Sequence, residues 1–563
     1  MKNVILFLLL SISFSVNAQI LIDEEYNDWN SVQTLITDPE SDGSGNIDFT
    51  EMKITNDSEY LYYRFNTGKE LNLQDNSKIY LYIDIDNNPG TGIAVNGTGA
   101  DISYDFGNRT GYYHRNSQII EFFHDDCGMI SLPTVTSSNF EMAFKRKFNA
   151  GSYLIVFGNK IRTVLAYNIS GGDKIPDQSG GYLYQMNSSE YVPHLFRINK
   201  NNPSHLRIMS YNVLQDGIFE NEPPYRRKIK AIQPDILCFQ EIYDHTSGEM
   251  NSKVKNWFGG NWYDAKIGSD IIIVSKYPIT KIETIGGNGA FLLNYNGQEI
   301  LIINVHLYCC DNDKDRQTEA DEIMQFIRNA KNKTGSFQLK QNTPVIITGD
   351  TNFVGLNQQR KTLLQGDIVS ESVFGKDFLP DWDFTFFEDS KPLTTGYPGS
   401  FTWKSDFSTY PAGRLDYIIY SGAVLQLENS FVLNTDLLSR DILDQYQLNN
   451  EDSFNASDHL PIVSDFSFRD ISLTYDSGNS KDLISIYPNP VSDNLNIKIQ
   501  NPDDVEIMIF NHLGELAYKE AVKSINGINS LDINISDLHA GFYTAIVFNK
   551  HSNTGTTVKF IKI

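Results

Sequence analysis

The middle of the sequence repeats one arrangement, in which an apolar run ends in a polar side chain. The runs "LRIMSYN", "DILCFQE", "ILIINVH" and "PVIITGDTN" end in or next to Asn212, Glu241, His306, Asp350 and Asn352. Strands commonly end in polar turn residues, so a single run of this kind indicates no more than a turn. The repetition, together with a histidine and a glutamate that are not turn formers, favours a shared chemical site at the strand ends.

Two further motifs add an aspartate and an Asp–His pair. "RLDYIIYS" places Asp416 inside an apolar strand, where a carboxylate without a partner would be costly. "SDHLPIV" places Asp458 and His459 directly before another apolar strand. Carboxylates, imidazoles and amides therefore gather at the ends of predicted strands.

This set of side chains predicts a hard divalent cation. The sequence has no Ser, Thr or Cys in a nucleophile elbow, and none of its Cys or His spacings suits zinc. Oxygen ligands favour Mg²⁺, with Mn²⁺ or Ca²⁺ as substitutes, and such ions also bind substrate phosphate oxygens. A metal, fixed donors and a His–Asp couple are consistent with chemistry at a substrate phosphate.

Six motifs in one order resemble those of the endonuclease/exonuclease/phosphatase superfamily: "SYNVL", "CFQE", "NVHL", "GDTN", "RLDYI" and "SDHLPI". The resemblance covers the predicted catalytic domain, residues 206–468. It implies a central four-layer α/β sandwich, in which two packed sheets are flanked by helices and the site lies where strand ends converge. It also implies a divalent-metal-dependent phosphoric ester hydrolase.

The resemblance carries metal-site roles to individual positions. Glu241 is similar to the principal metal ligand of the family, with Asn212 and Asp458 close to the metal or its waters. Asp350 is similar to the residue that positions or deprotonates the attacking water.

The remaining catalytic roles fall on two histidines and their neighbours. By the same resemblance, Asn352 and His306 would hold the phosphoryl oxygens. His459 resembles the essential histidine, with Asp416 accepting its other ring N–H and so fixing the tautomer.

Asp270 and Arg414 are candidate substrate-site residues. Many family nucleases carry a carboxylate that orients the first histidine, and Asp270 in "GSDIIIVSKYPI" is the nearest candidate, although a strand-start cap fits it equally. Arg414 and the cluster "YRRKIK" (residues 225–230) offer positive charge to a phosphodiester, whereas the cluster also fits the solvated face of a helix.

The charge balance limits the substrate without identifying it. A net charge of −24 argues against non-specific binding of polyanions through a basic surface, but not against phosphate chemistry at a metal. Our leading hypothesis is an extracellular endonuclease acting on DNA or RNA. The alternatives are a sphingomyelinase or phospholipase C-like enzyme, a phosphomonoesterase, and a non-catalytic binding or adhesion protein.

One aromatic loop bears on these alternatives. In "DFLPDWDFTFFED", residues 377–389, the aromatic side chains could enter a lipid interface, stack on unpaired bases, or pack on the core. They are Trp382, Phe384, Phe386 and Phe387.

A second loop follows the strand that ends in His306. "HLYCCDNDKDRQTEAD" resembles a Cys-Cys loop of some secreted superfamily members, and the pairing of Cys309 and Cys310 cannot be read from the sequence. Its aspartates fit either calcium binding or a solvated loop at a helix N-terminus. Helical spacing predicts that the chain continues as a helix, and it predicts a second one in "PPYRRKIKAIQPD".

Residues 19–196 predict an all-β sandwich, because short aromatic and β-branched runs alternate with turn residues. "YLYIDIDNNPGTG" and "GADISYDF" resemble a carbohydrate-binding-module-like β-sandwich, which implies a glycan partner. Asp84, Asp86 and Asn88 are spaced so that their oxygens can bind calcium, and they fit a strand-end turn as well.

The two ends of the chain predict export. Residues 1–18 read as a signal peptide, and no later segment is long and apolar enough to cross a bilayer. Residues 197–205 and 469–482 are predicted linkers. Residues 483–563, with "IYPNPVSDNLNI", "GFYTAIV" and "KFIKI", resemble the C-terminal sorting domain of type IX secretion substrates in Bacteroidota. This implies a small β-sandwich, the type IX machinery as a partner, and a location at the cell surface or outside the cell.

Overall fold

The computed structural model describes residues 19–33, 35–469, 484–499, 505–511, 516–522, 530–549 and 554–563. The predicted signal peptide and all but the first residue of the predicted second linker lie outside the described residues. The chain forms two compact units: one runs to Pro193, and the other begins at His194 and includes the short segments Leu71–Gln74 and Pro133–Ser137.

The first unit is built almost entirely from strands. One sheet has the order β1 (Leu35–Thr37), β2 (Glu51–Asn56), β3 (Tyr60–Leu71), β11 (Ser137–Lys145) and β10 (Ile130–Leu132). The other has the order β15 (Lys174–Ile175), β14 (Lys160–Tyr167), β4 (Ile79–Asp84), β7 (Ile102–Asp105), β8 (Thr110–Arg115) and β9 (Gln118–Phe122), and β16 (Tyr182–Gln185) also pairs with β14. Smaller elements are η1 (Asp28–Ser31), α1 (His124–Cys127) and the hairpins β5 (Ile93–Val95) with β6 (Thr98–Ala100) and β12 (Lys147–Ala150) with β13 (Tyr153–Val156).

Contacts between the two main sheets make this unit a sandwich. Tyr104 on β7 meets Phe144 on β11 edge to face, with ring centroids 6.1 Å apart. The buried Tyr63 hydroxyl on β3 donates to Thr163 Oγ1 on β14 at 3.2 Å. The inward side chains of both sheets therefore share one core, as the alternating aromatic runs predict.

The central domain contains two six-stranded sheets. The first has the order β19 (Tyr263–Ile267), β20 (Ile271–Ser275), β18 (Ile236–Gln240), β17 (Leu206–Asn212), β28 (Ile462–Phe468) and β27 (Leu425–Val432). The second has the order β21 (Ile279–Ile285), β22 (Asn288–Tyr295), β23 (Gln298–His306), β24 (Val345–Asp350), β26 (Asp416–Tyr420) and β25 (Glu388–Asp389).

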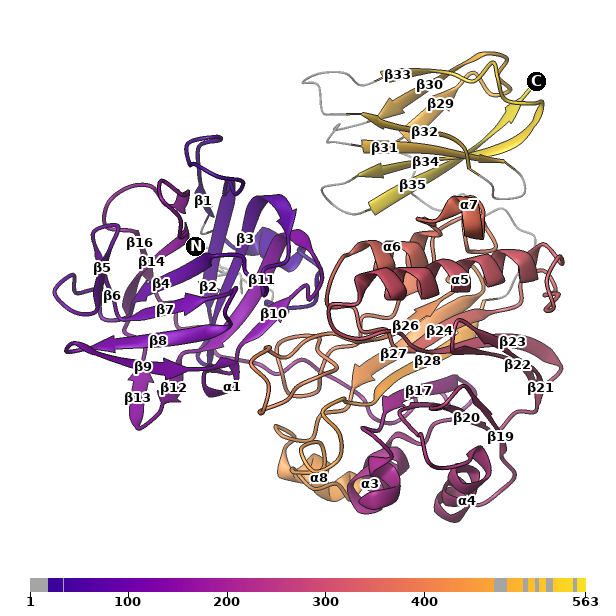
Figure 1. Ribbon diagram of the computed structural model, residues 1–563, viewed down its shortest axis with the longest axis horizontal. Helices are drawn as coiled ribbons and strands as arrows, with labels where there is room; N and C mark the ends of the chain where they lie inside the picture. The colour runs from indigo at the N-terminus through magenta and orange to yellow at the C-terminus, as the bar shows by residue number, and fades with distance from the viewer. Residues whose placement is uncertain are drawn as a thin grey trace, which may run out of the picture. The chain divides into compact units, whose positions relative to one another are not determined.

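Helices cover the outer faces of these sheets (Figure 1). They are α2 (Gly217–Glu220), α3 (Glu222–Ile232), α4 (Ser247–Phe258), α5 (Asp313–Lys331), α6 (Gln358–Gln365), α7 (Glu371–Phe374) and α8 (Arg440–Tyr446). Both predicted helices are confirmed: α3 has proline at its start and ends at Gln233 in the left-handed conformation. Helix α5 begins with aspartates and ends with basic residues, as the helix dipole favours.

Two apolar cores lie between helices and sheets. Ile229 of α3 and Val254 of α4 are buried in a cluster with the first sheet, and Ile323 of α5 is buried in a cluster with the second. Between the sheets, Gln240 Nε2 donates to Asn304 Oδ1 at 2.6 Å. The layers are thus helix, sheet, sheet and helix, which confirms the predicted four-layer α/β sandwich.

The third predicted domain is a small β-sandwich. One sheet has the order β29 (Ile484–Tyr487), β30 (Asn494–Ile499) and β33 (Ser530–Asn534), and the other has the order β32 (Leu516–Val522), β31 (Val505–Asn511), β34 (Gly541–Asn549) and β35 (Thr554–Lys562). Leu495 and Ile507, from different sheets, belong to one buried cluster. None of the helices among the described residues has the length and hydropathy required of a membrane span.

Two segments pack more closely than their sequence indicates. In the predicted linker 197–205, Ile198 is buried in the core beside the first sheet, and Lys200 pairs with Asp235. In the loop 377–389, Phe387 is buried and Trp382 packs on the core while its Nε1 donates to Thr343 O at 2.6 Å. The core-packing reading of this loop is therefore the correct one for these two side chains.

Candidate active site

The predicted site residues lie at strand ends because the strand pairing brings those ends together. Asn212 ends β17, and Glu241 follows β18 with a positive φ of 63°. In the second sheet His306 pairs with Asp350 across β23 and β24, and Asp350 pairs with Asp416 across β24 and β26. The register of two sheets, rather than proximity in sequence, builds the site.

Asn212 links two carboxylates. Its Nδ2 donates to Glu241 Oε1 at 2.9 Å and to Asp350 Oδ2 at 3.0 Å, and its Oδ1 accepts from the backbone N–H of Leu214. The other oxygen of Glu241, Oε2, accepts from Gln215 N at 2.9 Å. Asn212 therefore presents its amide nitrogen to the two carboxylates, and its predicted place close to a metal or its waters stays a prediction.

His306 is oriented by Asp270. Its Nδ1 lies 2.6 Å from Asp270 Oδ2, which leaves Nε2 facing Asp350 Oδ2 at 3.8 Å and Glu241 Oε1 at 3.9 Å. Burial opposes the charged imidazolium, but Asp270, Asp350 and Glu241 outweigh it and raise the pKa of His306 to about 9. Asp270 is thus placed as a histidine-orienting carboxylate directly before β20, and not as a direct substrate ligand.

His459 has the same arrangement with another aspartate. Its Nδ1 lies 2.8 Å from Asp416 Oδ2, and its Nε2 lies 3.5 Å from Asp350 Oδ2. Burial again disfavours the charged ring, yet Asp416 and Asp350 raise the pKa of His459 to about 10. Burial raises the pKa of Asp416 to about 6, because it outweighs the opposing effect of His459.

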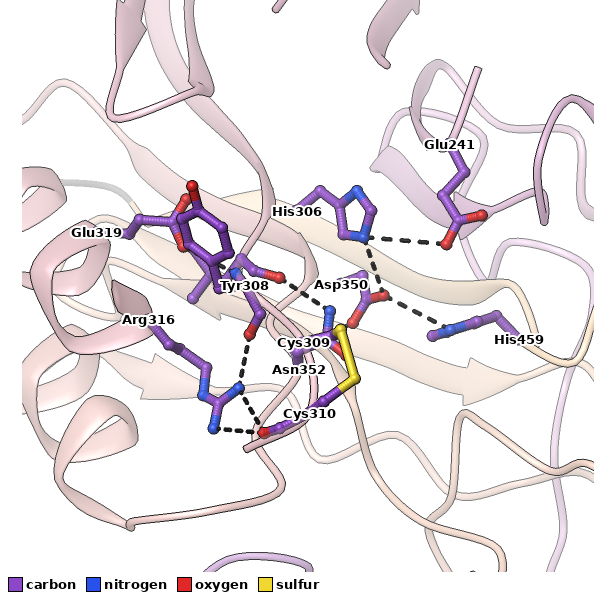
Figure 2. Close-up of a disulfide and its surroundings, with 11 residues drawn as sticks. Glu241, His306, Tyr308, Cys309, Cys310, Arg316, Glu319, Asp350, Asn352 and His459 are labelled. Carbon is purple, nitrogen blue, oxygen red and sulfur yellow. Dashed lines mark hydrogen bonds and ion pairs between the residues drawn. A yellow bond between two sulfur atoms is a disulfide. The ribbon is translucent and has the colours of Figure 1, made fainter. Parts of the chain in front are cut away.

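The two histidines approach one carboxylate from different sides. Figure 2 shows His306 and His459 both facing Asp350, with Glu241 facing His306. Such an arrangement brings two ring nitrogens that can carry protons and a carboxylate that can accept one to the same point. It suits reactions in which a water molecule loses a proton and a leaving group gains one.

The donor set fits a hard divalent cation. Ligand atoms of Glu241, His306 and Asp350 all lie within 4.8 Å of one another, and a second such group joins Asp350 to Asp416 and His459. Carboxylate oxygens in each group are the ligands that Mg²⁺ and Mn²⁺ prefer. Glu241 and Asp350 are the residues that would hold the ion.

Asp458 lies at the edge of this arrangement. Its Oδ2 accepts from Trp403 Nε1 at 3.0 Å, and its Oδ1 is enclosed without a hydrogen-bond partner. Among the described residues it belongs to none of the groups whose ligand atoms are close enough to share an ion. Its predicted metal role remains a prediction.

Asn352 and the loop after β23 border the site. Asn352 Nδ2 donates to Leu307 O at 2.9 Å, which uses one of its two amide hydrogens. Cys309 and Cys310 form a disulfide, and the buried Arg316 donates to Cys310 O at 3.3 Å (Figure 2). The loop aspartate Asp313 is bound by Arg316 at 2.8 Å, in agreement with a helix N-terminus.

Arg414 does not lie where a substrate can reach it. Its guanidinium is completely buried, pairs with Asp389 and stacks over Tyr417 at 4.0 Å. The predicted substrate-binding role of Arg414 is therefore corrected to a core ion pair, because an arginine next to a buried strand satisfies its charge inside the domain.

The basic cluster on α3 is not a free patch either. Arg227 forms an ion pair with Asp452 at 2.5 Å, and Lys228 is fully buried with its Nζ donating to Tyr211 Oη at 2.5 Å. Arg226 and Lys230 are the exposed members. Helical periodicity divides the cluster between the core and the surface.

The buried Lys228 is expected to make the free energy of unfolding depend on pH. Burial lowers its pKa to about 7, although Asp452 and Asp436 oppose the shift. In the unfolded chain the lysine has its ordinary pKa of about 10.4, so between about pH 7 and pH 10 the unfolded chain binds more protons than the folded chain does. The free energy of unfolding therefore rises with pH over this range, by at most about 1.4 kcal/mol per pH unit. Lys228→Met removes the buried charge and is therefore expected to raise Tm at pH 6. At pH 9 the increase in Tm is expected to be smaller.

Thermal unfolding of the full chain at both pH values measures this difference. Lys230→Met, on the exposed face of the same helix, is the control and is expected to leave the pH dependence unchanged. If Lys228→Met raised Tm by the same amount at pH 6 and at pH 9, the lowered pKa of the buried lysine would be contradicted.

The sequence pattern missed residues that support the site from elsewhere. Trp403, which binds Asp458, lies in a loop with no periodic signal. Ser457 Oγ donates to Asn212 O at 2.9 Å and also accepts from His459 N at 3.1 Å. Asn304, the polar residue inside "IINVH", was detectable as a break in an apolar strand.

Two family models match the chain. Residues 209–459 match the Endonuclease/Exonuclease/phosphatase family, and residues 485–563 match the secretion system C-terminal sorting domain. The search of curated proteins found no match.

Solved structures of other proteins align with the chain at low identity. They include the catalytic domain of human Nocturnin (18% identity, 47% of this chain and 95% of that one, TM-score 0.30) and TDP2 from D. rerio in complex with a single-strand DNA product (16%, 47% and 99%, TM-score 0.31). An endonuclease/exonuclease/phosphatase from Beutenbergia cavernae aligns at 11% identity over 63% of this chain and 100% of that one, with a TM-score of 0.32.

Proposed function

We propose that this protein is an exported, metal-dependent phosphodiesterase that cleaves DNA or RNA, because residues 209–459 match the endonuclease/exonuclease/phosphatase family and residues 485–563 match a secretion-system sorting domain. The observation that carries the proposal is the convergence of two carboxylate-oriented histidines on Asp350, with Nε2 atoms at 3.8 and 3.5 Å. Export follows from the sorting domain, which indicates type IX secretion to the cell surface or beyond.

Asp350 is the proposed acceptor of the proton from the attacking water. Its Oδ2 accepts from Asn212 Nδ2 at 3.0 Å and lies between the Nε2 atoms of the two histidines. A divalent cation bound by Glu241 and Asp350 would supply further positive charge for the phosphoryl oxygens.

The histidines are proposed to act on the phosphate. Asp416 accepts from Nδ1 of His459, and because the raised pKa keeps the ring protonated, Nε2 carries a second proton that points into the site and can stabilise a phosphoryl oxygen or the departing alkoxide. His306 presents its own Nε2 in the same way, oriented by Asp270. The second amide hydrogen of Asn352 is available to another phosphoryl oxygen.

Nucleic acid is favoured over lipid by where aromatic side chains lie. Phe387 and Trp382, in the aromatic loop 377–389 that was a candidate for a lipid interface, pack on the core. Tyr243 and Tyr308, each two residues beyond a site residue, are 42% and 53% exposed. Exposed rings beside a phosphodiester site can stack on unpaired bases without requiring a basic surface.

A substrate panel tests the assignment. The purified full chain is incubated with Mg²⁺ and with plasmid DNA, single-stranded DNA, RNA, sphingomyelin, phosphatidylcholine or inositol phosphates. We expect cleavage of polynucleotides, at a rate that Tyr243→Ala and Tyr308→Ala reduce more on single strands than on duplex. Release of a lipid head group or of free phosphate alone would replace the nuclease by the corresponding esterase.

A binding protein without catalysis is the remaining alternative. Such a protein would retain polymers in a pull-down assay and hydrolyse none of the panel. Two histidines, each oriented by an aspartate and facing one carboxylate, are not required for binding, which is why we rank this alternative below the enzymes.

A further inference from the structure

Three aspartates of the first unit, none of them a predicted catalytic residue, gather at one point. Asp84 ends β4, Asp101 lies between β6 and β7, and Asp86 lies in the loop that follows β4. Ligand atoms of the three carboxylates all lie within 4.8 Å of one another. Asp84 and Asp101 are buried, at 0% and 6% exposure, while Asp86 is exposed.

One carboxylate oxygen in this group is enclosed without a partner. Asp84 Oδ1 accepts from the backbone N–H of Asn88 at 3.0 Å, but Oδ2 is buried and has no hydrogen-bond partner. A buried anionic oxygen is costly unless a hydrogen bond or a positive charge compensates it. Oδ2 of Asp84 therefore indicates a ligand that protein atoms do not supply.

Basic side chains do not neutralise the group. Arg162, the cross-strand partner of Asp84, donates instead to Asn87 Oδ1 and Gly180 O, both at 2.7 Å. Among the residues that the structure describes, the three aspartates form no ion pair with lysine or arginine. Burial raises the pKa of Asp101 to about 6, and the neighbouring carboxylates add to this shift.

Glycines hold the loop close to the strand that leads to Asp101. A Cβ at Gly99 would lie 2.3 Å from Thr91 O and 2.5 Å from Asn88 O, so any larger residue would displace the loop. Gly92, with a φ of +61°, could accept no Cβ either, because Ala100 O would lie 2.2 Å away. The loop is thus fixed in one conformation with the carboxylates already assembled.

We propose that Asp84, Asp86 and Asp101 bind a calcium ion that ties the end of β4 and its loop to the start of β7. Calcium takes six to eight oxygen ligands at about 2.3–2.6 Å in a flexible geometry, which suits carboxylates from a strand end, a loop and a second strand start. Magnesium binds at about 2.0–2.1 Å and demands a near-ideal octahedron, which such a set is less suited to supply. The ion would stabilise the first unit and play no part in catalysis.

Hydrogen exchange by mass spectrometry tests the site locally in the full chain. Exchange is compared in about 10 mM calcium chloride, in the same concentration of magnesium chloride, and in EGTA. The calcium concentration is chosen because extracellular calcium-binding modules often have Kd values near 1 mM. At about ten times Kd, binding slows exchange by about tenfold where the site must open. We expect that protection in residues 85–101 with calcium, and much less with magnesium.

Two variants connect the protection to the aspartates. Asp84→Asn is expected to abolish the calcium-dependent protection and to leave phosphodiester hydrolysis unchanged. Asp86→Asn, at an exposed position where folding is not at risk, is expected to weaken calcium binding at least tenfold. Asp125→Asn, an exposed aspartate of α1, is the matched control and should retain full protection.

Local readout is needed because another acidic group, Asp42, Asp48 and Asp173, lies in the same unit. Equal exchange of residues 85–101 with calcium and EGTA would overturn the proposal, as would equal protection by magnesium. Full protection in Asp86→Asn would also overturn it. If the carboxylates share protons instead, exchange in this segment would respond to pH and not to calcium.

Discussion

Replacement of His459 by alanine is expected to lower kcat for phosphodiester cleavage at least about a thousandfold, with a smaller change in KM. The reason is that Nε2 of His459 is one of two oriented ring nitrogens at Asp350, and its positive charge is present at neutral pH because the pKa is raised to about 10. Oriented proton donors of this kind contribute about 10²–10⁴ to a rate, and the imidazolium adds charge stabilisation. Initial rates on the best substrate of the panel measure the loss.

Two companion variants separate catalysis from folding. Asp416→Asn removes the acceptor that fixes the His459 tautomer and is expected to cause a loss of similar kind, about a hundredfold or more, while circular dichroism stays unchanged. His114→Ala, in the first unit beside Ser103, is the control and should keep full activity. If His459→Ala retained more than about a tenth of the wild-type rate, the proposed role of the His–Asp pair would be wrong.

Glu241→Gln is expected to give the second large effect, a loss of activity of at least about a hundredfold at low metal concentration. Glu241 and Asp350 are the carboxylates that Asn212 joins, and removing one charge weakens the binding of a hard cation. Excess metal should restore part of the activity, because the weaker site then fills. The measurement is the Mg²⁺ and Mn²⁺ concentration for half-maximal rate in wild type and variant.

Chelation completes this test. EDTA is expected to abolish hydrolysis by the wild type, and added Mg²⁺ or Mn²⁺ to restore it. Glu249→Gln changes an exposed carboxylate at the N-terminus of α4 and should leave the metal requirement untouched. Full activity of the wild type in EDTA would contradict a metal-dependent mechanism at Glu241.

Much of the candidate site could be predicted because its residues interrupt a regular pattern. Glu241, His306 and Asp350 each terminate an apolar strand, and the same strand ends are neighbours in the folded sheets. Arg414 shows the limit of this reasoning, since a single sequence does not reveal whether a charged residue beside a strand faces solvent or an internal partner. Asp389, which pairs with it, is distant in sequence.

The sequence was sufficient to predict the layers of the fold, but not which strands pair with each other in the sheets. Alternating strands and helices indicated an α/β domain, and proline and aspartate at helix starts located α3 and α5. Strand order depends on contacts between segments that are distant in the sequence, and local propensity does not report such contacts. The hydrogen bond from Trp403 to Asp458 is another contact of this kind. The packing of Ile198, in a segment without periodicity, has the same cause.

The pairing of β17 with β28 joins the beginning of the catalytic domain to its end, with Leu206 opposite Phe466. During synthesis the chain emerges from the ribosome in sequence order. The sheet that contains Asn212 is therefore complete only after nearly the whole domain, including β28, has been made. His459 is among the last residues of the domain to appear. A chain that ends before residue 459 therefore carries no assembled site, so the proposed activity depends on synthesis of nearly the whole catalytic domain.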